Sequence, residues 1–271
     1  MKRLFVFGCS LSRYAYATWA DLAGANFDEY YNFARAGGSN SLMMGRLVEA
    51  DERFNFNKDT DTVLIMVTGI GRHSYYLPYE GWVAKGDLYS YVNNSKDKIM
   101  EFFLKNMHSD KNDVYNSWLS VKTMKQLLVA KNIPHKILLG INYSDYLNKN
   151  EYNDEDSIKK VLAIQSMLDI TTPLHDWFAN RTDDITGSNT PFYTESTISD
   201  GHPSQKMHYE FLKEFLPEYN TDKTKEMFDY VESIFDGRTQ HKQEQTYRTK
   251  FYREYNKAFT NPLFGMGQEL W

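Results

Sequence analysis

A single cysteine, the lack of any long apolar segment and a mild net charge set the first limits on this chain of 271 residues. One cysteine cannot form an internal disulfide, which argues against a disulfide-stapled secreted fold and fits a reducing compartment. No segment approaches the roughly 20 apolar residues of a membrane span, and the first residues enter a strand pattern rather than a signal-peptide pattern. The net charge of −5 gives no overall case for binding nucleic acid or membranes. We therefore expect a cytoplasmic protein with no membrane partner.

What the chain does contain is enough apolar and aromatic residues, 41% and 15%, for a large core. Short continuous apolar runs occur at Leu4–Phe7, Thr62–Val67 and Ile137–Ile141. Such runs are typical of strands buried on both faces, as in a parallel sheet. They alternate with stretches of helical period, so the sequence predicts an α/β fold over residues 1–236. The expected architecture is a three-layer, doubly wound, mostly parallel sheet of the flavodoxin-like kind.

The intervening segments complete this prediction. A further short strand is expected at Asp28–Ala34, and Ser39 or Asn40 is expected to cap the helix that follows it. Two segments lack a sustained period and are predicted as long loops, the aromatic Tyr75–Asn94 and the polar Thr182–Ser199. Helices are predicted at Tyr14–Gly24, Ser41–Asp51, Asp97–Lys131 with a break near Ser109–Asp113, Asp156–Leu168, Pro203–Phe215 and Lys223–Phe235.

Residues 237–271 differ in character and are predicted to form a basic, aromatic, helical extension. Six basic and two acidic residues between Arg238 and Lys257 give a local charge of +4. Phe251, Tyr255 and Phe259 follow at helical spacing and would share one face of a helix. That face is expected to pack on the body of the protein or on a second copy in a homo-oligomer. Nucleic-acid binding by the basic and aromatic groups is the weaker alternative.

Three short stretches carry the chemistry. They are Gly8-Cys9-Ser10 after the first strand, the loop 32–40 after the second, and Asp200-Gly201-His202-Pro203-Ser204 before a late helix. A serine hydroxyl needs an adjacent base to become a nucleophile, and a histidine accepts and returns a proton near neutral pH. A carboxylate can orient that imidazole. Ser10, His202 and Asp200 are therefore the candidate catalytic residues.

In order and spacing these stretches resemble the SGNH (GDSL-like) hydrolase family, over roughly residues 1–217. The match is nearest to the divergent members found in tailed phages, which carry a D-x-HPS form of the last stretch. The resemblance implies a serine hydrolase, with Ser10 as nucleophile, His202 as base and Asp200 as orienting acid. It also implies an oxyanion hole formed by the backbone N–H groups of Ser10 and Gly37 and by a side-chain amide.

The sequence departs from the family pattern in three places. Cys9 stands where the family usually has aspartate, and we interpret it as a small buried residue. The third strand is followed by Gly69-Ile70-Gly71-Arg72, without the family's asparagine. Asn40, Thr68 or Arg72 would have to replace that oxyanion donor, and Arg72 could hold an anionic group of the substrate. Asp200 precedes His202 by two residues instead of three, so a dyad acting without it stays open.

Each residue also has a purely structural interpretation. Ser10 could cap the following helix, His202 could be an ordinary structural histidine, and Gly37-Gly38 could be only a turn. His202 and His208 lack the accompanying ligands of a zinc site, and no phosphate-binding glycine motif is present. We therefore expect no metal and no cofactor.

The leading hypothesis is an SGNH-type ester hydrolase, an esterase or acetylesterase acting on a small acyl ester of a carbohydrate or similar polar carrier. Polar and aromatic loops favour such a carrier over a lipid tunnel. An O-acyl or group transferase acting on a sugar or a nucleic-acid modification is one alternative. A non-catalytic binding or assembly protein on the same fold is the other, because the usual asparagine is missing.

Overall fold

A four-stranded sheet with every pair of neighbours parallel forms the centre of the protein. The computed structural model describes residues 1–14, 16–77, 81–87, 98–143, 154–179, 202–235 and 255–264. The strands are β1 (Arg3–Phe7), β2 (Glu29–Asn32), β3 (Asp61–Val67) and β6 (His135–Leu139). Their order in the sheet is β2-β1-β3-β6. The doubly wound parallel architecture predicted from the apolar runs is confirmed.

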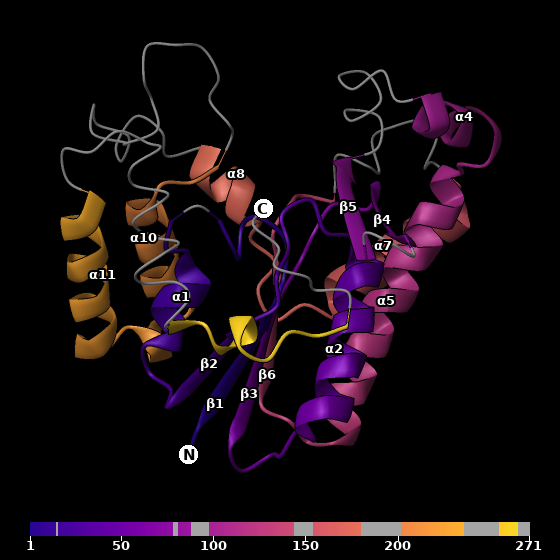
Figure 1. Ribbon diagram of the computed structural model, residues 1–271. Coiled ribbons are helices and arrows are strands. Elements are labelled where there is room, and N and C mark those ends of the chain that lie inside the picture. The colour runs from indigo at the N-terminus through magenta and orange to yellow at the C-terminus, as the bar shows by residue number, and fades with distance from the viewer. Residues whose placement is uncertain are drawn as a thin grey trace.

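Helices cover both faces of this sheet, which gives the predicted three layers (Figure 1). One face carries α1 (Trp19–Gly24), α10 (Gln205–Phe215) and α11 (Asp222–Phe235). The other carries α2 (Asn40–Phe54), α5 (Asp110–Ala130) and α7 (Glu155–Ser166). The remaining elements are α4 (Lys98–Asn106), α8 (Leu174–Ala179) and the 3-10 turns η2 (Pro217–Tyr219) and η4 (Lys257–Phe259). Among the described helices, none combines the length and apolar character needed to cross a bilayer.

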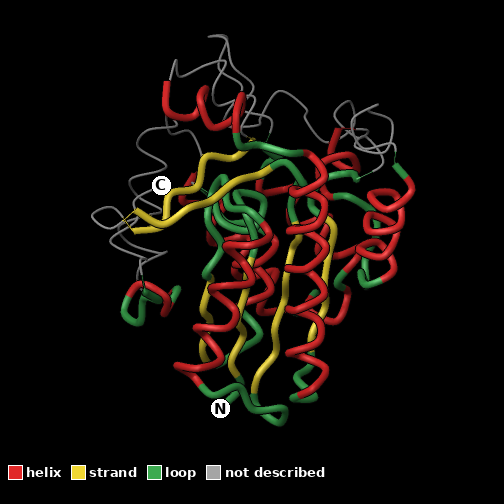
Figure 2. The backbone as a smooth tube through the Cα atoms, turned by 90° about the vertical axis from the view of Figure 1, so that its right-hand side faces the viewer, coloured by secondary structure: helices red, strands yellow, loops and turns green. Residues whose placement is uncertain are grey.

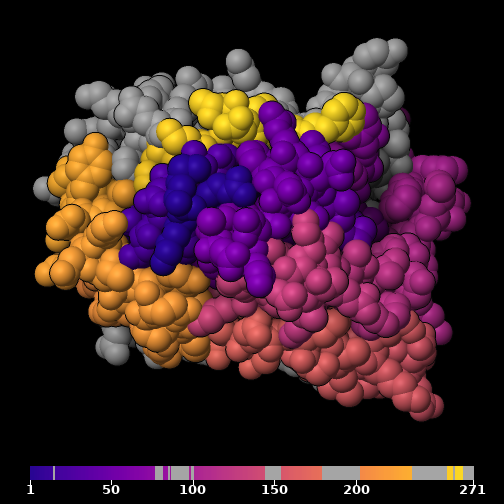
Figure 3. Space-filling model, turned by 90° about the horizontal axis from the view of Figure 1, so that it is seen from below, coloured from indigo at the N-terminus to yellow at the C-terminus, as the bar shows by residue number. Residues whose placement is uncertain are grey.

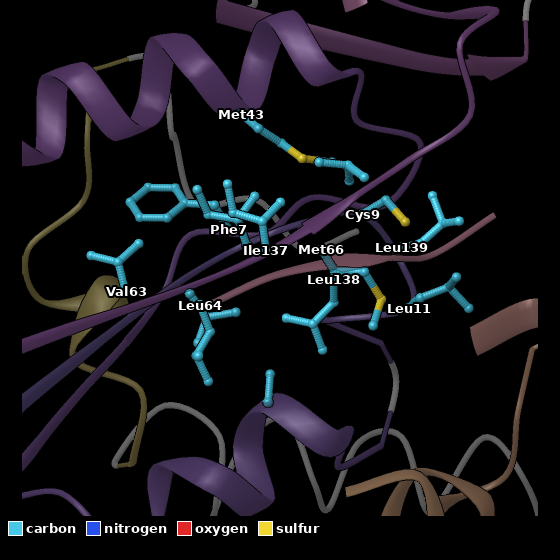
Figure 4. Close-up of a cluster of buried hydrophobic side chains, with 14 of the residues drawn as sticks. Phe7, Cys9, Leu11, Met43, Val63, Leu64, Met66, Ile137, Leu138 and Leu139 are labelled. Atoms are coloured by element: carbon cyan, nitrogen blue, oxygen red, sulfur yellow. The ribbon is translucent and has the colours of Figure 1, made fainter. Parts of the chain in front are cut away.

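Burial on both faces explains why the central strands are continuously apolar. All side chains from Leu4 to Phe7 and from Val63 to Val67 are fully buried. In Figure 4 successive side chains of a strand alternate between the α2 side, where Met43 lies, and the opposite side. Cys9 is also fully buried and belongs to this apolar cluster, as predicted for a small buried residue.

The helix predicted from Tyr14 begins later, at Trp19. The chain before it forms a tight turn instead, in which the N–H groups of Ser12 and Arg13 both donate to the carbonyl of Cys9. Thr18 is the N-cap residue of this helix, and its N–H donates to Asp21 Oδ2 at 2.9 Å. This pair is one half of a capping box, a signal for a helix N-terminus. By contrast, the predicted cap of α2 is confirmed, since Ser39 Oγ accepts from Leu42 N–H.

The segment predicted as an irregular loop from Tyr75 contains a hairpin instead. Strands β4 (Arg72–Leu77) and β5 (Gly81–Asp87) pair antiparallel, with a register shift after His73. Figure 2 shows this hairpin lying across the upper ends of the main strands. Two hydrogen bonds fasten it to the loop after β2, from Gly86 N–H to Gly37 O and from Ser39 N–H to Ser74 Oγ, both 3.1 Å.

Most of the predicted extension 237–271 lies outside the described residues, as does the loop Thr182–Ser199, so the boundary after residue 236 stays a prediction. The described part, 255–264, follows the outer edge of β2, and in Figure 3 it is the yellow strip beside the violet N-terminal elements. The helical face expected through Phe259 is interrupted, because Asn256 forms a parallel bridge with Tyr30 and a 3-10 turn follows. Asn256 Oδ1 accepts from Asn32 N–H at 2.8 Å, and its Nδ2 donates to Asn32 O.

This pairing predicts that Asn256→Ala destabilises the protein. Asn256 is fully buried, so its loss leaves the edge N–H of Asn32 without its acceptor. We expect the free energy of unfolding to fall by about 1–3 kcal/mol. Asn261→Ala is the matched control, because the Asn261 side chain is only partly buried and donates to its neighbour Thr260 at an exposed contact. It should change stability by less than about 0.5 kcal/mol. Equal effects of the two substitutions in denaturant unfolding would contradict this assignment.

Candidate active site

Ser10 lies in the turn that leaves the carboxyl end of β1. The turn is closed by Cys9 O, which accepts from Ser12 N–H at 3.0 Å and Arg13 N–H at 3.2 Å. Gly8 is required at the start of this turn, because a Cβ at that position would collide with the side chain of Ser12. Ser10 is 6% exposed, so only a small part of the residue is in contact with solvent.

Buried polar groups hold the Ser10 turn from beneath. Ser12 O accepts from Asn32 Nδ2 at 2.8 Å and from Thr18 Oγ1 at 2.9 Å. Asp21 completes this network, since its Oδ1 accepts from Tyr30 Oη at 2.9 Å and it is fully buried. Burial raises the pKa of Asp21 above its ordinary value, although several hydrogen bonds oppose the shift. Satisfied networks of this kind fix the backbone that carries the candidate nucleophile.

The glycine loop after β2 runs beside the Ser10 turn, because Arg35 N–H donates to Gly8 O at 3.0 Å. Gly37 has a φ of +71°, and a Cβ there would lie 3.0 Å from Gly86 N. Only glycine suits both the backbone conformation and the close approach of the hairpin. Within the described part of the chain, neither Ser10 N–H nor Gly37 N–H donates to a backbone carbonyl.

Asn40 and Thr68, both predicted from sequence, are brought into direct contact. Asn40 Oδ1 accepts from Thr68 N–H at 2.9 Å, and Asn40 Nδ2 donates to Thr68 O at 3.1 Å. The same Nδ2 lies 3.2 Å from Tyr143 Oη and 3.4 Å from Ser117 Oγ. Both N–H groups of the amide therefore have acceptors inside the protein. In this geometry Asn40 joins the start of α2 to the end of β3.

Two further polar groups at this edge of the sheet have unused hydrogen-bonding capacity. Thr68 Oγ1 and Arg72 Nη1 are buried and find no partner within the described ranges. Buried polar atoms are rarely left unpaired in folded proteins, so each is a candidate to meet a ligand or an ordered water. Arg72 opens β4, immediately after the loop that follows β3.

The late segment that contains His202 docks on the chain just after the Ser10 turn. The rings of Tyr14 and His202 stack, with centroids 4.1 Å apart and planes 15° apart. Tyr16 Oη donates to Pro203 O in the same region. Ser204 then caps α10 by accepting from Met207 N–H, which fixes the direction of the chain after His202. Asp200 lies outside the described residues, so its role stays a prediction.

His208, one turn into α10, belongs to the same corner but is a different kind of group. It is fully buried, and its Nδ1 has no partner within the described residues. Burial, and to a smaller extent the nearby His202, lower the pKa of His208 to about 3. His208 is therefore neutral at physiological pH and packs as part of the core.

Several contributors to this site were not predicted from the sequence. Tyr14 and Tyr16 contact the His202 segment, and Tyr143 Oη accepts from Asn40 Nδ2. No spacing signal marks them, because each acts on a segment distant in the chain. Within the described residues, a group that could hold a metal ion comprises His73, His108 and Asp113, beside the site rather than at Ser10.

No protein-family description matches the chain, and no curated protein matches it. Among solved structures it is similar to a GDSL-like lipase from Bacteroides thetaiotaomicron, with 12% identity, a TM-score of 0.40, and coverage of 80% of this chain and 86% of that one. It is also similar to TesA, with 14% identity, a TM-score of 0.38, and coverage of 81% and 98%. A GDSL-like protein, of the kind expected from the motifs, is thus among the solved structures to which the chain is similar.

The burial of His208 predicts a pH-dependent stability. Its folded pKa of about 3 lies below the ordinary value near 6.5, so the unfolded chain binds the proton first. Its contribution is fully present above pH ~6.5 and is lost as the pH falls toward about 3, at up to about 1.4 kcal/mol per pH unit. The free energy of unfolding, measured with denaturant, should therefore fall more steeply on acidification for wild type than for His208→Gln.

His175→Gln is the control for this comparison, because the side chain of His175 is 48% exposed. It should leave the acid dependence of the unfolding free energy unchanged. If His208→Gln and wild type lose stability with the same slope between pH 6 and pH 4, the proposed neutral state of His208 is wrong.

Proposed function

We propose that this protein is a serine ester hydrolase in which Ser10 is the nucleophile and His202 the general base. The observation that carries the proposal is the docking of the His202 segment on the chain that follows Ser10, through Tyr14 and Tyr16. Segments far apart in the sequence thereby contact each other close to the chain that leaves the carboxyl end of β1. In open α/β folds, ligands bind at the carboxyl ends of the strands.

In the proposed reaction Ser10 Oγ attacks the acyl carbonyl while His202 accepts its proton. The carbonyl oxygen becomes an oxyanion, for which the N–H groups of Ser10 and Gly37 are the nearest candidate donors. Collapse of this intermediate expels the alcohol, which takes the proton back from His202. Water then hydrolyses the acyl-enzyme by the same steps, and Asp200 is the proposed partner that orients the imidazole.

Asn40 and Thr68 have a supporting role in this proposal. Their reciprocal hydrogen bonds hold the loop after β3 against the start of α2, beside the glycine loop. Arg72, with one buried guanidinium nitrogen that has no partner in the described structure, is the proposed contact for an anionic or strongly polar part of the substrate.

The proposed substrate is a small acyl ester on a polar carrier such as a carbohydrate. The hairpin β4–β5 beside Gly37 carries aromatic residues of the type on which sugar rings stack, among them Trp82, which meets Tyr76 edge-on with ring centroids 5.8 Å apart. One face of Tyr76 is itself stacked on Phe264. A sugar hydroxyl that replaces water in the second step would make the same site an O-acyltransferase. The alternative is a binding or assembly role without catalysis, and two experiments distinguish it from ester hydrolysis.

Turnover of p-nitrophenyl acetate by purified protein tests the nucleophile. Ser10→Ala should lower kcat/KM by at least about 1,000-fold, because the attacking oxygen is removed. Ser12→Ala is the matched control in the same turn, since the network uses its backbone carbonyl and not its hydroxyl. Wild-type turnover by Ser10→Ala would reject the mechanism.

A fluorophosphonate probe separates catalysis from binding alone. Wild type and Ser12→Ala should be labelled, and Ser10→Ala should not, because labelling needs an activated serine. The position of the adduct is read by peptide mass spectrometry. A correctly folded wild type that stays unlabelled and inactive would favour the non-catalytic alternative.

A further inference from the structure

Three side chains from separate parts of the chain converge beside the hairpin. His73 lies on β4, His108 in the link between α4 and α5, and Asp113 in the first turn of α5. Nε2 of His73 lies 3.1 Å from the Asp113 carboxylate, and Nε2 of His108 lies 2.7 Å from it. One ligand atom from each residue falls within 4.8 Å of the other two.

The surroundings of this group favour a bound cation over a solvated surface cluster. The side chains of His108 and Asp113 are only 4% and 3% exposed, and that of His73 is 21% exposed. Phe103 packs edge-on against the His73 ring, with centroids 5.8 Å apart. Both imidazoles thus direct Nε2 toward one nearly buried carboxylate. A single metal ion bound between them would take the place of the protons that the two Nε2 atoms otherwise share with the carboxylate.

We propose that His73, His108 and Asp113 bind one divalent transition-metal ion, and that zinc fits best. Two imidazole nitrogens and a carboxylate are common zinc ligands, whereas calcium and magnesium prefer oxygen ligands. Ligand atoms on a tetrahedral zinc ion lie about 3.2–3.5 Å apart, so the two shorter separations need to open by only a few tenths of an ångström. Asp110 Oδ1, 3.8 Å from His108 Nε2, offers a further oxygen close to the group.

Such an ion would join the hairpin to the helical layer. His73 follows Arg72 directly, and β5 of the same hairpin bonds Gly37 through Gly86. On α5, Asp113 lies one helical turn before Ser117, whose Oγ is 3.4 Å from Asn40 Nδ2. The metal would therefore fix the hairpin beside the candidate active site. The metal site rests on its own geometry and does not depend on the ester-hydrolase proposal.

Metal binding by tag-free protein tests this directly. Protein stripped with a chelator should take up about one zinc ion per chain, measured with a competing chromophoric chelator. Cobalt should bind at the same place and give the visible absorption of a nitrogen- and oxygen-coordinated ion. His73→Ala and His108→Ala should each weaken zinc binding by at least about 100-fold, more than loss of an outer-sphere partner costs.

His175→Ala is the matched control. His175 Nδ1 lies 3.7 Å from Asp176 Oδ1, so this is another His–Asp pair, but its two side chains are far more exposed, at 48% and 35%. It should bind zinc as wild type does. If His108→Ala fails to fold, His73→Ala decides, because His73 is the most exposed of the three. Wild type that binds no zinc, or a folded His73→Ala variant that binds it as tightly as wild type, would overturn the proposal.

Discussion

The parallel pairing of β1 with both β2 and β3 is the constraint on which the rest of the structure depends. It places the carboxyl ends of three strands at one edge, so the turn with Ser10, the glycine loop and the loop with Thr68 must emerge side by side. The pairing is possible because β1 carries no polar side chain between Leu4 and Phe7, and both of its faces are buried. A polar residue in that strand would disturb the core and the site together.

Three of the four strands of the sheet were predictable because they are short apolar runs, a local sequence signal that agrees with their burial in the folded protein. Leu4–Phe7 and the run ending at Val67 are buried throughout, as their composition requires. The motif stretches were predictable for the same reason, since each follows a strand or precedes a helix. The cap at Ser39 needed only a short polar side chain before a helical period. Catalysis by Ser10 and His202 goes beyond these local signals and stays a proposal.

The hairpin and the true start of α1 escaped prediction for physical reasons. The strand β4 mixes polar and aromatic residues, and it pairs over the edge of the main sheet rather than within its core. Helix α1 starts at the capping pair Thr18 and Asp21, a signal that was present but outweighed by the aromatic run before it. His73 and Asp113 stand 40 positions apart, so no spacing rule could join them.

The candidate site is therefore assembled in two stages with different physical origins. Strand pairing determines where each loop leaves the sheet. Contacts between the loops then determine the position that each loop takes up above the sheet. The hairpin is fixed through Gly37, whose positive φ and lack of a Cβ admit the backbone of Gly86. The His202 segment is fixed through Tyr14 and Tyr16 rather than through the sheet. Since neither attachment uses a strand of the main sheet, the loops of the site can change while the sheet beneath them stays the same.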